Sequence, residues 1–225
     1  MVLIAALLLA AGAAAADPVV EETPLYHAEI SVAAVSDARL AALLRARAEA
    51  VTAEFRAWAA EADPERPYQF SLVDEVVFAS DAWISVRRDL WAYTGGAHGN
   101  AWIETTLWDV AAGRPAGLDA LLTPRGVERL SAAARAAIED EIWGGEIDPF
   151  WIEAVDAATA PEALGVFTLA PGDMPGAAAE IEILFAPYAV GPYALGSNAV
   201  RIARLAFEPD VTEAGRALFG GGPLD

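Results

Sequence analysis

The chain has 225 residues, with 33 acidic and 14 basic side chains and no cysteine. Its net charge of −19 argues against a nucleic-acid-binding protein, because a phosphate backbone requires a basic surface. The lack of cysteine in the sequence excludes disulfide bonds, thiolate zinc sites and a cysteine nucleophile.

The first sixteen residues form an apolar run that ends in small residues and is followed by Asp17 and Pro18. This pattern predicts a secretory signal peptide cleaved near Ala16. A membrane span takes about 20 apolar residues, so an uncleaved signal anchor is the less favoured alternative. We expect a periplasmic or secreted protein with no membrane span in residues 17–225. These residues are enough for one α+β domain, or for two interlocked lobes, 17–115 and 116–225.

The N-terminal half has the pattern of a strand, a long helix and a meander. Alternating apolar residues predict the strand over 25–35. Ser36 is a plausible N-cap for the helix, which the segment 63–67 ends. One helical face is apolar and carries Leu40, Leu43, Leu44, Val51, Phe55 and Trp58. Three further alternating runs predict an antiparallel meander over 68–79, 82–93 and 101–110.

In the C-terminal half, Thr123 and Pro124 have the N-cap and first-turn signature of a helix. This helix should run to about Trp143, where two glycines follow. The remaining expected elements are a short helix at 149–158, strands at 164–169, 180–185 and 199–206, and a closing helix at 212–219. The predicted fold class is α+β: an antiparallel sheet with a long N-terminal helix and a second, interlocked α+β lobe.

The segment YTGGAHGN, residues 93–100, packs three glycines and one of the two histidines between two strand-like runs. His98 has three open roles: a structural residue bonded to loop backbone, a contact to a ligand or partner, or a general base. No G-x-S-x-G, H-E-x-x-H or EF-hand pattern occurs in the sequence. We therefore assign no catalytic residue, no metal ligand and no cofactor.

A second segment, FAPYAVGPYALG, occupies residues 185–196. Its prolines and glycines set a rigid, irregular path between two strands. Tyr188 and Tyr193 are then either displayed as anchors for a protein or glycan, or packed as caps over the core.

Together the two segments resemble a bacterial exported domain family. That family includes the extracellular domain of the lysozyme-sensing anti-sigma factor RsiV and the accessory domain of the peptidoglycan deacetylase PdaC. The resemblance implies an exported α+β fold of two interlocked lobes, linked to the cell envelope. It implies lysozyme binding in the RsiV-like branch, whereas in the deacetylase-like branch the chemistry belongs to a separate catalytic domain.

The function predicted on these grounds is a non-enzymatic binding module of the cell envelope. Its expected partner is a basic protein such as lysozyme, favoured by the acidic charge, or a peptidoglycan fragment. The candidate contact residues are Tyr93, Gly95, Gly96, His98, Asn100, Tyr188 and Tyr193. The alternative is a peptidoglycan hydrolase with His98 in its site, which would need an acid or nucleophile within hydrogen-bond reach of that ring.

Overall fold

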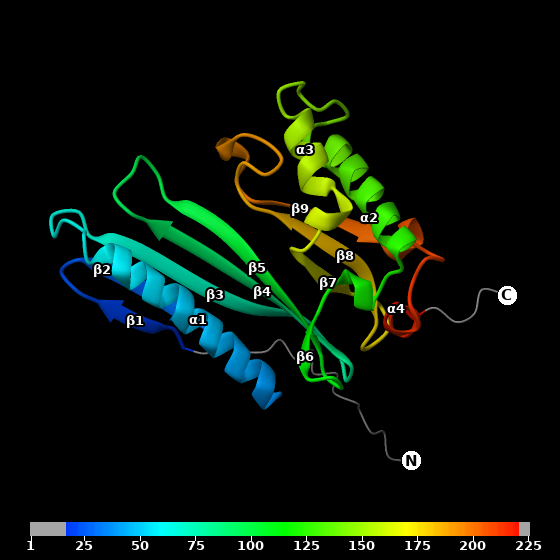
Figure 1. Cartoon of the computed structure of the whole chain (residues 1–225), viewed down its shortest axis with the longest axis horizontal. Coiled ribbons are helices and arrows are strands. Elements are labelled where there is room, and N and C mark those ends of the chain that lie inside the picture. Colours follow the sequence, from blue (N-terminus) through cyan, green and yellow to red (C-terminus); the bar gives the residue numbers. More distant parts are fainter. Residues whose placement is uncertain (1–16, 221–225) are drawn as a thin grey trace, which may run out of the picture.

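The computed structural model describes residues 17–220, so the predicted signal peptide lies outside the described residues. None of the helices within 17–220 has the length and apolar character needed to cross a membrane. The strands form a six-stranded sheet in the order β1-β2-β3-β4-β5-β6 and a three-stranded sheet in the order β7-β8-β9. Figure 1 shows the two sheets and the helices that accompany each.

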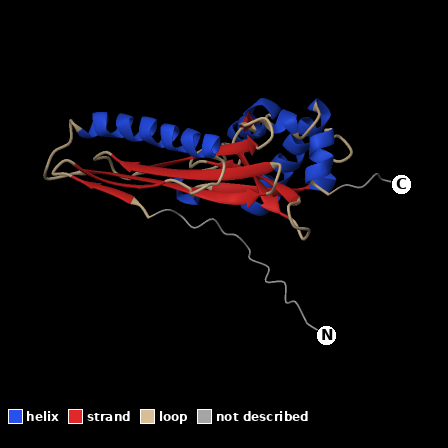
Figure 2. Ribbon diagram, turned by 90° about the horizontal axis from the view of Figure 1, so that it is seen from below, coloured by secondary structure: helices blue, strands red, loops and turns tan. Residues whose placement is uncertain are grey.

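The six-stranded sheet contains the predicted meander. Its strands are β1 (Val19–Glu22), β2 (Tyr26–Ser31), β3 (Tyr68–Ala79), β4 (Trp83–Tyr93), β5 (Asn100–Asp109) and β6 (Arg114–Ala116). All neighbouring strands pair antiparallel except β2 and β3, which pair parallel. A parallel pair needs a long crossover connection. Helix α1 (Ala38–Ala59) supplies it and lies along one face of the sheet (Figure 2).

The long helix begins one residue later than Ser36 would place it, because Asp37 is the N-cap. The Asp37 carboxylate accepts hydrogen bonds from the backbone N–H groups of Arg39, at 2.8 Å, and Leu40, at 3.1 Å. The buried positions of α1 form one stripe along its length: Leu40, Leu44, Ala48, Thr52, Phe55 and Ala59. The stripe packs on the sheet, where the Phe55 ring stacks on Phe70 with centroids 4.9 Å apart.

The second lobe combines the smaller sheet with helices. Its strands are β7 (Phe167–Pro171), β8 (Ala178–Phe185) and β9 (Asn198–Ala203), and its helices are α2 (Pro124–Ala137), α3 (Ile152–Thr159) and α4 (Glu213–Leu218). A π-helical segment, Ile138–Ile142, extends α2 to the predicted end near Trp143. Short 3-10 turns occupy Leu118–Ala120, Pro161–Ala163, Tyr193–Leu195 and Arg204–Ala206. The last of them ends the final strand at Ala203, earlier than the expected position 206.

The two sheets meet through β7. The backbone N–H of Leu169 donates to the Ser85 hydroxyl at 3.2 Å, and that of Phe167 donates to the Thr105 hydroxyl at 3.2 Å. Apolar residues of the larger sheet belong to the same buried cluster as the second lobe: Phe78, Trp83 and Leu107. The predicted α+β class with an interlocked second lobe is therefore confirmed, while the lobe boundary at 115/116 stays a prediction.

Candidate functional site

The two sequence motifs, distant along the chain, lie against each other in the structure. The loop between β4 and β5 presents His98, whose ring stacks on Tyr193 with centroids 4.0 Å apart and planes at 25°. The Tyr188 ring lies 5.4 Å from that of Tyr193, at 39°. Both tyrosines belong to the connection between β8 and β9 (Figure 1). We call His98, Tyr188 and Tyr193 the aromatic cluster.

One backbone carbonyl fixes two of these side chains. The Tyr193 hydroxyl donates to the carbonyl oxygen of Gly99 at 2.8 Å, and His98 Nδ1 lies 2.9 Å from the same oxygen. Because a carbonyl oxygen only accepts, Nδ1 carries the hydrogen in this contact. Nε2 of His98 makes no hydrogen bond to any of the other described residues. The His98 ring is exposed, yet its orientation is set by the loop and by Tyr193.

Two glycines of the first motif have backbone roles. Gly95 adopts φ +87, a left-handed conformation that side chains rarely take. Gly99 is buried, and a Cβ there would overlap the indole ring of Trp91. Gly96 has neither requirement, since the nearest atom to a Cβ there would be the His98 carbonyl oxygen at 3.8 Å. Of the predicted contact residues, Gly95 thus shapes the loop and Gly96 is free to change.

The two tyrosines of the second motif have different surroundings. Tyr193 is half-buried between its neighbours, whereas Tyr188 is 55% exposed. Tyr188 also has φ 70, the only positive φ among the described non-glycine residues. Such strain persists only where the surrounding structure imposes it, and it clusters at functional sites. The same loop is tied to the second lobe by Trp143, whose indole N–H donates to the carbonyl oxygen of Val190 at 3.1 Å.

Tyr93 and Asn100 do not join the aromatic cluster. Both sit at strand ends in the sheet, where Tyr93 pairs with Gln69 and Asn100 pairs with Ala92. Asn100 lines a separate cavity of about 660 Å³ next to α1, together with Trp58 and other aromatic residues. The prediction that Trp58 belongs to the apolar face of the helix is wrong, since it is 53% exposed.

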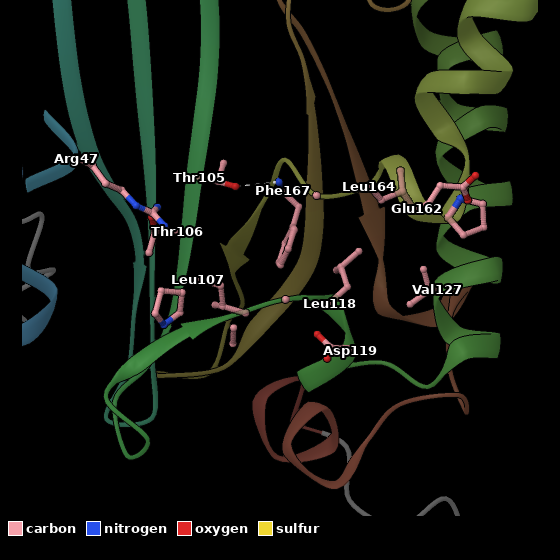
Figure 3. Close-up of a pocket in the computed structure, with 15 residues that line it drawn as sticks. Arg47, Thr105, Thr106, Leu107, Leu118, Asp119, Val127, Glu162, Leu164 and Phe167 are labelled. Atoms are coloured by element: carbon pink, nitrogen blue, oxygen red, sulfur yellow. Dashed lines mark hydrogen bonds between the residues drawn. The ribbon is translucent and has the colours of Figure 1, made fainter. Parts of the chain in front are cut away.

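A second cavity, of about 320 Å³, lies between the two lobes (Figure 3). Arg47 and Glu162 line it from opposite sides, with Asp119 below. Its polar groups are partly engaged within the protein: Arg47 donates to the Thr106 hydroxyl at 3.0 Å, and Phe167 donates to Thr105. No group of three or more His, Cys, Asp or Glu within residues 17–220 is arranged to hold a metal ion.

No protein-family model matches the chain, and no curated protein matches its sequence. Solved structures of the DUF3298 family share its fold. A member from Bacteroides fragilis NCTC 9343 has a TM-score of 0.61 at 17% identity, covering 89% of this chain and 93% of that one. A DUF3298 family protein from Pseudomonas aeruginosa PAO1 has a TM-score of 0.62 at 15% identity, covering 88% and 94%.

The protein therefore has the fold of the DUF3298 structures, a class defined as a domain of unknown function. At such identities the likeness concerns the fold alone. The finer resemblance to RsiV and PdaC stays a prediction.

Proposed function

We propose that this protein is an exported binding module of the bacterial cell envelope that recognises a basic, lysozyme-like protein through the aromatic cluster. The observation that carries the proposal is that the two motifs meet in one cluster of rings. His98 stacks on Tyr193, both bond the Gly99 carbonyl, and Tyr188 packs at a tilt against Tyr193. Aromatic side chains held rigid in this way make effective anchors, because they bury large areas at a small cost in conformational entropy.

The charge of the chain supports a basic partner. The net charge is −19, and ion pairs to acidic side chains engage many of the arginines: Arg39, Arg56, Arg87, Arg88, Arg129, Arg135, Arg201 and Arg204. The acidic groups left over generate a negative field that attracts a basic protein and raises its association rate. Export of the protein is proposed from the apolar run at residues 1–16, and the resemblance to the RsiV-like branch points to lysozyme.

The surroundings of His98 favour binding over hydrolysis. A general base needs the group that it deprotonates within hydrogen-bond reach, and an orienting group behind it. The ring of His98 is instead bonded to backbone and stacked on Tyr193. We expect His98→Ala to lower the unfolding temperature by destabilising the β4–β5 hairpin. It should not remove a peptidoglycan hydrolase activity. A His98→Ala protein that unfolds at the wild-type temperature but loses peptidoglycan hydrolysis would support the hydrolase alternative.

Calorimetric titration of the purified protein with a basic lysozyme tests the proposal. We expect micromolar or tighter binding at low salt that weakens as salt screens the charges. Tyr188→Ala should weaken it about tenfold, the effect of removing a central aromatic anchor. Phe150→Ala is the matched control, because Phe150 is an aromatic residue, 82% exposed, that makes no ring contact with the aromatic cluster. Absence of heat at low salt, or equal binding by the Tyr188 variant, would overturn the proposal.

A further inference from the structure

An aromatic groove lies at the C-terminal end of α1, beside the β4–β5 hairpin. Its volume is about 660 Å³, within the range of sites that hold small ligands or peptide side chains. Three aromatic residues from three elements line it: Trp58 of α1, Tyr68 of β3 and Trp102 of β5. Glu61 and Asn100 add polar groups to the lining. We call this site the aromatic groove.

The core of the protein holds part of this lining in place. Trp102 packs against the buried Phe70, with ring centroids 6.5 Å apart, and Tyr68 packs on the same buried cluster. Trp58, by contrast, is 53% exposed, although its neighbour Ala59 is fully buried. The groove therefore combines two fixed rings with one that is open to a partner.

The charges at the groove favour a cation. Glu61 is the only acidic or basic side chain among the described residues that line it. No ion pair or hydrogen bond within residues 17–220 engages the Glu61 carboxylate. The C-terminal end of a helix also carries a partial negative charge, and α1 ends at Ala59, two residues before Glu61.

We infer that the aromatic groove binds a lysine- or arginine-bearing segment of a basic protein partner. Ammonium and guanidinium groups bind over the faces of tryptophan and tyrosine, and a carboxylate beside those rings pairs with the same cation. The inference rests on the proposed function in expecting a basic partner, but it uses none of the three residues of the aromatic cluster. It gives the exposed Trp58 and the unpaired Glu61 a shared role.

Titration with a tetralysine peptide, followed by calorimetry at low salt, tests the inference with two matched pairs of variants. Trp58→Ala and Glu61→Gln should each weaken binding about fivefold or more, as expected for loss of a cation–π or ion-pair contact. The controls are Phe150→Ala, which removes an aromatic ring 82% exposed elsewhere, and Glu65→Gln, which removes the same charge from the exposed turn after α1. Each control should change binding by less than about twofold.

Two outcomes would overturn the inference. Equal weakening in Glu61→Gln and Glu65→Gln, with no effect of Trp58→Ala, would mean attraction by diffuse charge only. The groove would be assigned to a saccharide if Trp58→Ala weakened the binding of an N-acetylglucosamine trimer but left the affinity for tetralysine unchanged. The lysozyme titration on Tyr188→Ala reports separately on the proposed function. If Trp58→Ala and Glu61→Gln lose tetralysine binding while the wild-type protein does not bind lysozyme, the inference about the groove stands and the proposed function is rejected.

Discussion

The hydroxyl of Tyr193 donates a hydrogen bond of 2.8 Å to the carbonyl oxygen of Gly99, which lies 94 positions earlier in the chain. The same oxygen accepts Nδ1–H of His98, so one backbone carbonyl holds both halves of the motif pair. Gly99 precedes β5 of the larger sheet, and Tyr193 lies between β8 and β9 of the smaller one. The contact therefore links the hairpin of one lobe to a loop of the other.

Removing the hydroxyl of Tyr193 should weaken this link without removing the ring stack. We expect Tyr193→Phe to lower the free energy of unfolding by about 1 kcal/mol, the usual net value of one hydrogen bond. Tyr188→Phe is the matched control, because the Tyr188 hydroxyl makes no hydrogen bond to another residue within the described range. Chemical denaturation of both variants measures the difference. Equal stability of the two would show that the bond to Gly99 does not hold the loops together.

The two glycines at positions 96 and 99 should tolerate alanine very differently. A Cβ at Gly99 would overlap the Trp91 ring, whereas at Gly96 the nearest atom would be 3.8 Å away. We expect Gly99→Ala to cost about 1–3 kcal/mol, as overpacking does, and Gly96→Ala to stay within about 0.5 kcal/mol. Thermal unfolding of the pair checks this. A tolerated Gly99→Ala would mean that the Trp91 indole moves aside easily.

Hydrophobic periodicity predicted most of the elements but not all of their pairings. The meander of β3, β4 and β5 follows from alternation in each strand and short turns between them. The parallel pairing of β2 with β3 depends on how α1 crosses the sheet, which no local pattern encodes. The short strands β1 and β6 carry too few residues for a clear period. Asp37 and Ser36 are both good N-cap residues, so the sequence does not decide between them. The predicted N-cap, Ser36, is wrong, because Asp37 caps the helix.

The candidate site was predictable as two motifs and not as one surface. The glycines of the first motif indicated an unusual backbone conformation, and Gly95 has one, with a positive φ. The stacking of His98 on Tyr193 is a contact between distant segments, which spacing along the chain does not contain. Trp58 was missed for a related reason. It flanks the buried stripe of α1, and its exposure depends on what packs beside the helix from elsewhere in the chain.

The N-cap of α1 should make stability depend on acid pH. The Arg39 side chain first, and then the backbone N–H of Leu40, lowers the pKa of Asp37 from 3.8 to about 2. A carboxyl group with a depressed pKa in the folded state stabilises the fold above its unfolded pKa. That stabilisation is lost as the pH falls through the folded pKa. The stability advantage of the wild type over Asp37→Asn should therefore be full above pH 3.8 and fade toward about pH 2.

Urea denaturation at a series of pH values measures this difference. Ser36→Ala is the control, because Asp37 and not Ser36 accepts the hydrogen bonds of the first turn. The control should match the wild type at every pH. A gap between wild type and Asp37→Asn that does not narrow in acid would contradict the assigned role of the carboxylate.

Arg88 and Asp74 form a buried ion pair beneath α1, and removing only one of the two charges should lower the stability strongly. Arg88 donates to Asp74 through Nε, at 2.6 Å, and Nη2, at 2.9 Å, and both side chains are at most 4% exposed. Arg88→Met leaves the Asp74 carboxylate uncompensated, so we expect a loss of about 3–5 kcal/mol in the free energy of unfolding. The double variant Arg88→Met, Asp74→Leu removes both charges and should recover part of that loss.

The solvent-exposed pair of Arg135 and Asp156 provides the comparison, with side chains 37% and 53% exposed. Arg135→Met should cost no more than about 1 kcal/mol, because solvent screens a surface pair. Denaturant titrations of the wild type, Arg88→Met, Asp74→Leu and the double variant form a double-mutant cycle for Arg88 and Asp74. Similar costs for Arg88→Met and Arg135→Met would mean that water reaches the pair beneath α1. A double variant less stable than Arg88→Met alone would mean that shape, and not charge pairing, governs this part of the core.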